Sequence, residues 1–142
     1  GSLPGWPMVM DAAEEFYFKP EAGRVLASPA DETDSPPVDA QPEELDIALA
    51  ADQVERATTL RVRRISHRWA GLRNFLPDRL PVAGLDPADS RFVWLAGLGG
   101  FGIMTSEALG RAATAAAIGE TLPADLMARG IDGANLSPAR LA

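Results

Sequence analysis

The sequence predicts an α+β fold: a small antiparallel sheet with one flanking helix, followed by a strand, a glycine-rich loop and a second helix. Three observations predict this class. Short β-forming runs fill residues 7–28, a run with helical periodicity opens at Pro42, and glycines separate an apolar run from an alanine-rich one. The chain has 142 residues, of which 46% are hydrophobic, enough for the core of an ordinary domain.

Composition excludes several classes of function. The formal net charge of −7 argues against a nucleic-acid partner, because phosphate contacts require clustered lysine and arginine. There is no cysteine, and His67 is the only histidine, so we expect no disulfide, no metal site and no serine–histidine–aspartate triad. The apolar runs are too short for a transmembrane segment, and a cytoplasmic protein is the default expectation.

The first elements are short strands. Residues 7–11, 15–19 and 23–28 are rich in β-formers, and Pro20–Gly23 has the composition of a turn, so a three-stranded antiparallel meander is predicted. Residues 29–41 hold three prolines and four acids, which predicts an exposed loop.

A helix is predicted over residues 42–58. Pro42 suits the first helical position because its missing N–H has no intrahelical use there. The acids that follow favour the positive end of the helix dipole. Apolar side chains recur at helical spacing on one face: Ile47, Ala51, Val54 and Ala57.

Three further strands are predicted. Residues 61–69 alternate imperfectly between apolar and basic side chains, which indicates a strand with one wet face and a bulge near Arg63. Residues 77–81 form a turn, and 82–85 and 92–96 are short strands. The last of these is apolar at every position, as in a strand covered on both faces.

The glycine-rich loop lies between the last strand and an alanine-rich helix. Its glycines at 97, 99 and 102 spell G-x-G-x-x-G. The helix is predicted over residues 105–118, with Thr105 or Ser106 as its N-cap and Gly119 at its C-terminal end. Residues 120–142 are rich in turn formers and predict a peripheral tail with a short helix near 124–128.

Three interpretations of this loop remain open. A self-contained dinucleotide fold is disfavoured, because no strand ending in an acidic residue follows the helix. The glycines could instead make a tight strand-to-helix turn with close packing. In the third interpretation, the loop closes over a cofactor that is held mainly by another part of a larger protein, with the helix N-terminus facing the ligand.

Several motifs in order resemble the C-terminal part of FAD-dependent oxidoreductases of the D-amino-acid oxidase type. They are Phe16–Pro20 (FYFKP), Trp69–Arg73 (WAGLR), Leu80–Gly84 (LPVAG) and Trp94–Ile103 (WLAGLGGFGI). The group includes glycine oxidase, sarcosine oxidase and D-amino-acid dehydrogenase, and the resemblance runs from about residue 7 to 119.

The resemblance implies a cofactor, FAD, and a division of the chain. Residues 1–80 would belong to a substrate-binding antiparallel-sheet domain, 81–119 to the FAD-binding domain and 120–142 to a tail. The dinucleotide fingerprint and most of the FAD would lie in an N-terminal half that is missing here. The residues that this resemblance places against the flavin ring are Gly97, Gly99, Gly100, Phe101, Gly102 and Ile103.

The resemblance also implies two substrate-binding residues. Arg73 stands where relatives grip the substrate carboxylate, and a guanidinium suits that task because it donates two parallel hydrogen bonds. The alternative for Arg73 is a pair with Asp78 or a surface position. Tyr17 would face the substrate cavity, with a place on the sheet face as its alternative. No residue of the chain is assigned as catalytic.

The function implied is oxidation of a small amine or amino acid by hydride transfer to flavin, with the enzyme formed by the full-length protein. The alternative is a non-catalytic binding or assembly module, or a small subunit that completes a flavoprotein partner. Apolar patches left where another half should dock could drive homo-oligomer formation.

Overall fold

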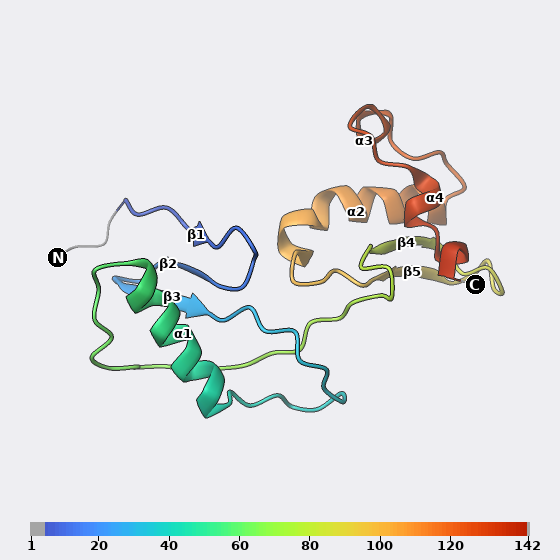
Figure 1. Cartoon of the computed structure of the whole chain (residues 1–142). Coiled ribbons are helices and arrows are strands. Elements are labelled where there is room, and N and C mark those ends of the chain that lie inside the picture. Colours follow the sequence, from blue (N-terminus) through green and yellow to red (C-terminus); the bar gives the residue numbers. More distant parts are fainter. Residues whose placement is uncertain (1–4, 142) are drawn as a thin grey trace. The chain divides into compact units, whose positions relative to one another are not determined.

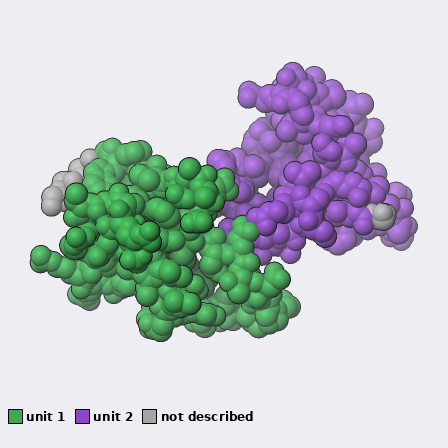
Figure 2. All heavy atoms as spheres, in the orientation of Figure 1, with its two compact units in different colours: residues 1–72 green, residues 73–142 purple. Residues whose placement is uncertain are grey.

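The computed structural model describes residues 5–141, which fall into two compact units. Unit 1 extends to Leu72 and unit 2 begins at Arg73 (Figure 2). Both contain helix and antiparallel sheet, so the predicted α+β class is confirmed.

Unit 1 contains a three-stranded antiparallel sheet in the order β1 (Val9–Met10), β2 (Tyr17–Glu21), β3 (Arg24–Ser28) (Figure 1). The predicted meander is therefore confirmed. The turn between β2 and β3 is shorter than expected and consists of Ala22 and Gly23, whose φ angles are +46° and +76°. Two consecutive positive φ angles match the right-handed twist of a hairpin, so the chain needs only these two residues to reverse.

The predicted first helix is α1 (Glu44–Ala57), which packs near β3 and buries Val54 (Figure 1). It begins two residues later than expected. Glu43 is extended, with φ −83° and ψ 146°, and its carbonyl accepts the first helical hydrogen bond, from the N–H of Ile47 at 3.1 Å. Pro42 therefore precedes the helix cap.

The predicted strand at residues 61–69 is wrong: within residues 5–141 this segment pairs with no strand. Its alternating pattern favours an extended chain, but a strand also needs a neighbouring edge to pair with. Hydrogen bonds to side chains tether the segment instead, including Val62 N to Glu55 Oε1 at 2.7 Å and Arg68 Nη1 to Glu44 Oε1 at 2.9 Å. Trp69 stays 62% exposed.

Unit 2 is built on a hairpin of β4 (Val82–Leu85) and β5 (Val93–Ala96), against which α2 (Gly102–Ala117) packs (Figure 1). Both strands were predicted, but the expected burial of both faces of β5 is wrong. The buried strand is β4, whereas Trp94 and Leu95 of β5 are exposed. An all-apolar run therefore does not by itself predict a strand buried on both faces, because burial also depends on the elements that pack against it.

The end of the chain forms α3 (Ala124–Ala128), α4 (Gly133–Leu136) and a 3₁₀ turn, η1 (Pro138–Leu141). The short helix near 124–128 is confirmed. The core of unit 2 comprises Ala83, Leu109, Ala112, Leu126 and Leu136. Leu126 and Leu136 are thus part of this core, whereas most other residues of the segment 120–141 are exposed.

The termini of α2 show one confirmed and one wrong prediction. At the C-terminal end, Gly119 N–H donates to the carbonyl of Ala116 and Glu120 N–H to that of Ala115, the paired bonds of a Schellman motif. At the other end, the helix begins at Gly102, so Thr105 and Ser106 lie inside it and are not caps. Their hydroxyls donate back to the carbonyls of Phe101 and Ile103 at 2.9 Å each.

Candidate functional site

The glycine-rich loop between β5 and α2 has a backbone that strongly favours glycine. Gly97, Gly99 and Gly100 have φ angles of +72°, +55° and +94°, in the left-handed region that side chains disfavour. Gly102 has an ordinary helical backbone as the first residue of α2.

The sides of Gly97, Gly99 and Gly100 on which a Cβ would stand face residues 73–76 of the same unit. Gly99 N–H donates to the carbonyl of Asn74 at 3.0 Å. A Cβ on Gly97 would lie 2.6 Å from Leu76 Cγ, and one on Gly99 would lie 3.0 Å from Phe75 Cε1. The contact between loop and segment therefore requires glycine, which supports the close-packing interpretation for these two positions.

The N-terminus of α2 has no side-chain cap and carries exposed apolar residues. Phe101 occupies the N-cap position without a side-chain cap, and the first turn holds no acidic residue. The first N–H groups of a helix lack intrahelical acceptors and carry the positive end of its dipole. Beside them, Ile103 and Met104 are 96% and 76% exposed. Such an end fits a flat, largely apolar group with electronegative atoms on one edge.

Arg73 lies beside this loop. A Cβ on Gly100 would be 3.0 Å from Arg73 Cδ, and the guanidinium carbon of Arg73 is 5.3 Å from the centre of the Phe75 ring. Asp78 pairs with Arg140, whose Nε lies 2.6 Å from Asp78 Oδ2. That hydrogen bond is the main reason why the pKa of Asp78 lies below its ordinary value.

The structure does not gather all the predicted site residues in one unit. Tyr17 is half-buried on β2 of unit 1, opposite Met10 and Ser28, whereas Arg73 and the glycine loop belong to unit 2. Sequence patterns did not indicate a role for Phe75, because its contact with the loop at Gly99 joins residues more than 20 positions apart.

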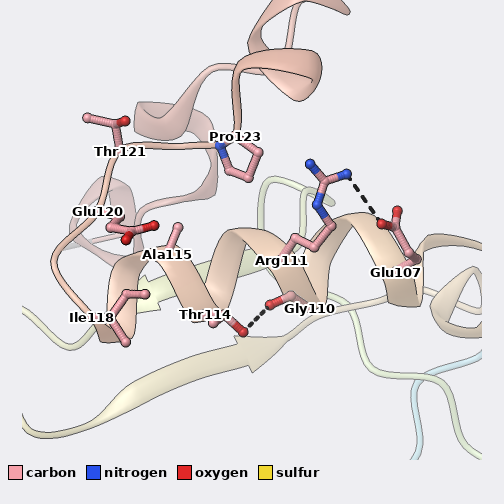
Figure 3. Close-up of a pocket in the computed structure, with 9 residues that line it drawn as sticks. All are labelled: Glu107, Gly110, Arg111, Thr114, Ala115, Ile118, Glu120, Thr121 and Pro123. Atoms are coloured by element: carbon pink, nitrogen blue, oxygen red, sulfur yellow. Dashed lines mark hydrogen bonds and ion pairs between the residues drawn. The ribbon is translucent and has the colours of Figure 1, made fainter.

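A shallow groove of about 520 Å³ lies elsewhere in unit 2, between α2 and the chain that leads into α3 (Figure 3). Arg111 projects at this groove and pairs with Glu107 of α2 and with Asp125 of α3. The Arg111 hydrogen bonds lower the pKa of Asp125. None of the predicted site residues lines the groove, so we favour the loop as the site.

The sequence profile of the FAD dependent oxidoreductase family matches residues 2–116. The chain belongs to this family. FAD is therefore its expected cofactor, and the matched region includes both sheets, α1, the glycine loop and nearly all of α2.

Part of a flavin site fits the residues of this oxidoreductase, and part does not. The uncapped N-terminus of α2 and the exposed Ile103 and Met104 suit the ring system of FAD. In residues 5–141, however, both sheets are antiparallel, and no parallel strand follows α2 to complete a dinucleotide fold. This agrees with the sequence, which disfavoured a self-contained dinucleotide site.

Two other expectations concern groups of residues. No cluster of three histidine, cysteine, aspartate or glutamate side chains in the described chain is arranged to hold a metal ion. Within the same residues, no helix is both long and apolar enough to cross a lipid bilayer.

Proposed function

We propose that this chain is the C-terminal part of a flavoenzyme that oxidises a small amine or amino acid bearing a carboxylate, in the manner of glycine oxidase, sarcosine oxidase or D-amino-acid dehydrogenase. One observation carries the proposal. The Arg73 side chain packs against Gly100, two residues before the uncapped N-terminus of α2. A carboxylate anchor and an electron-accepting ring would thus share one corner of unit 2.

The start of α2, Arg73 and Tyr17 each have a role in this proposal. Bound FAD would supply the hydride acceptor. The N–H groups at the start of α2 stabilise negative charge on the ring edge that they face, worth about 0.3–1 kcal/mol at an exposed helix end and up to about 2 kcal/mol when water is excluded. Arg73 donates two hydrogen bonds to the substrate carboxylate and so orients its amine. Tyr17 is proposed as an aromatic wall of the substrate cavity.

The proposal assigns the rest of the FAD site to an N-terminal half. The exposed apolar side chains Ile103 and Met104 at the loop support this assignment, since a larger protein would cover them. The assignment of residues 1–80 to a substrate domain and of 81–119 to the FAD-binding domain belongs to the same proposal. The structure divides the chain slightly earlier, after Leu72.

The test uses the full-length protein, first through its visible spectrum. We expect bound flavin that is bleached anaerobically by at least one of glycine, sarcosine and D-alanine. Arg73→Ala should raise KM about 10- to 100-fold, since a hydrogen bond to a charged group contributes about 1.5–3 kcal/mol. The control is Arg91→Ala, which removes an exposed arginine of the same unit that pairs with Asp89, and KM should not change. A colourless protein would overturn the proposal, and an unchanged KM would remove Arg73 from the site.

A binding or assembly module is the second candidate, and the same exposed apolar residues, Ile103 and Met104, favour it. The coding sequence upstream of Leu3 separates the two candidates. An early strand followed by G-x-G-x-x-G and an acid about 20 residues later supports the enzyme. A start codon near Leu3 supports a separate subunit that completes a flavoprotein partner.

A further inference from the structure

Phe75 contacts both Arg73 and the glycine loop. Its half-buried ring approaches Gly99 so closely that a Cβ there would lie 3.0 Å from Phe75 Cε1. The guanidinium carbons of Arg73 and Arg79 lie 5.3 and 4.7 Å from the ring centre. Both distances are within the range of about 6 Å in which an aromatic ring attracts a cation.

Backbone hydrogen bonds fix the main chain on both sides of Phe75. On one side, Asn74 accepts the hydrogen bond from Gly99 N–H at 3.0 Å. On the other, Arg79 N–H donates to the carbonyl of Leu76 at 2.8 Å and closes a turn, in which Arg79 has φ +61°. The main chain is therefore fixed on both sides of Phe75, and the ring itself packs on Gly99.

We propose that Phe75 is a positioning residue that helps to hold the Arg73 side chain beside Gly100, where the proposed function places the substrate carboxylate. This inference rests on the proposed function, in which Arg73 is the carboxylate anchor. Arginine has many rotamers, and ordering them before the substrate arrives removes an entropic cost from binding. A cation–ring contact at an exposed site corresponds to a change in affinity of about twofold to fivefold.

The experiment compares Phe75→Leu with Phe75→Tyr in the full-length flavoprotein, with glycine, sarcosine and D-alanine as substrates. Leucine keeps an apolar side chain but removes the ring, so KM should rise about twofold to fivefold while kcat and the flavin spectrum stay unchanged. Tyrosine keeps the ring and should retain the original KM. Phe92→Leu is the matched control, because Phe92 is an exposed aromatic of unit 2 that contacts Trp94, and its KM should not change.

Phe75 also packs on Gly99, so Phe75→Leu could lose flavin for a purely structural reason. Fluorinated phenylalanines at position 75 avoid this outcome, because they preserve the shape of the ring while weakening its attraction for a cation. The logarithm of KM should rise stepwise from one to three fluorine atoms. A KM that is flat across the fluorinated series overturns the inference while leaving the proposed function intact. A flavin that none of the three substrates reduces overturns the proposed function, and this inference with it.

Discussion

The most specific consequence of the loop geometry concerns Gly97. This glycine is buried, has φ +72° and faces Leu76, whose Cγ and Cδ1 would lie 2.6 and 2.8 Å from an added Cβ. Gly97→Ala therefore introduces two costs. A side chain in the left-handed region costs about 1–2 kcal/mol, and overpacking against Leu76 adds about 1–3 kcal/mol. Since Leu76 is only half-buried and can shift, we expect a loss of about 2–4 kcal/mol in the free energy of unfolding of unit 2.

The assay is urea unfolding of the full chain followed by the fluorescence of Trp94. The other two tryptophans, Trp6 and Trp69, lie in unit 1 and are replaced by phenylalanine, so that the signal reports unit 2 alone. With a urea dependence of about 1–3 kcal/mol per molar, the midpoint should fall by about 0.7 M or more.

The matched control is Gly110→Ala. Gly110 lies within α2, and an added Cβ would meet no heavy atom within 4 Å. Alanine is the better helix former, so this variant should be stabilised by about 0.5–1 kcal/mol. If Gly97→Ala were as stable as the original chain, the contact between the loop and residues 73–76 would be refuted.

Two further predictions concern the last segment of unit 2. Leu136 is only 8% exposed in the small core, so Leu136→Ala should destabilise unit 2 by about 2–3 kcal/mol, and a urea midpoint unchanged from the original would contradict its place there. The second prediction concerns pH. Because Arg140 lowers the pKa of Asp78 below its ordinary value of 3.8, their contact contributes stability that is fully present above that pH and is lost as pH falls through the lower, folded-state value. The stability lost in Arg140→Gln, measured by urea midpoints across pH 2–6, should therefore shrink below about pH 4, and a constant difference would be inconsistent with the pairing.

Local signals in the sequence predicted much of the fold. The β-forming runs around Pro20, the acids after Pro42 and Gly119 each specify their element through neighbours within a few residues, and these elements are present. The failures depend on distant partners. Residues 61–69 have the pattern of a strand but no edge to pair with, and β5 is apolar without being covered on both faces.

In the candidate site, too, the local features could be predicted from the sequence and the long-range contacts could not. The glycines at 97, 99 and 100 could be recognised from sequence, because their left-handed backbone excludes most other residues. What faces them could not, since Phe75 and Leu76 come from a segment more than 20 residues earlier. Thr105 and Ser106 were wrongly expected as caps, because both hydroxyls have backbone carbonyls within reach inside the helix.

The central claim is that the open N-terminus of α2 faces the flavin, with Arg73 at the substrate carboxylate. A crystal structure of the full-length protein with FAD and acetate bound tests it most directly. The account predicts that N–H groups among Gly102, Ile103 and Met104 lie within hydrogen-bond distance of the ring system, and that the Arg73 guanidinium contacts the acetate. A flavin bound away from this helix end, with the three N–H groups facing only protein or solvent, would contradict it.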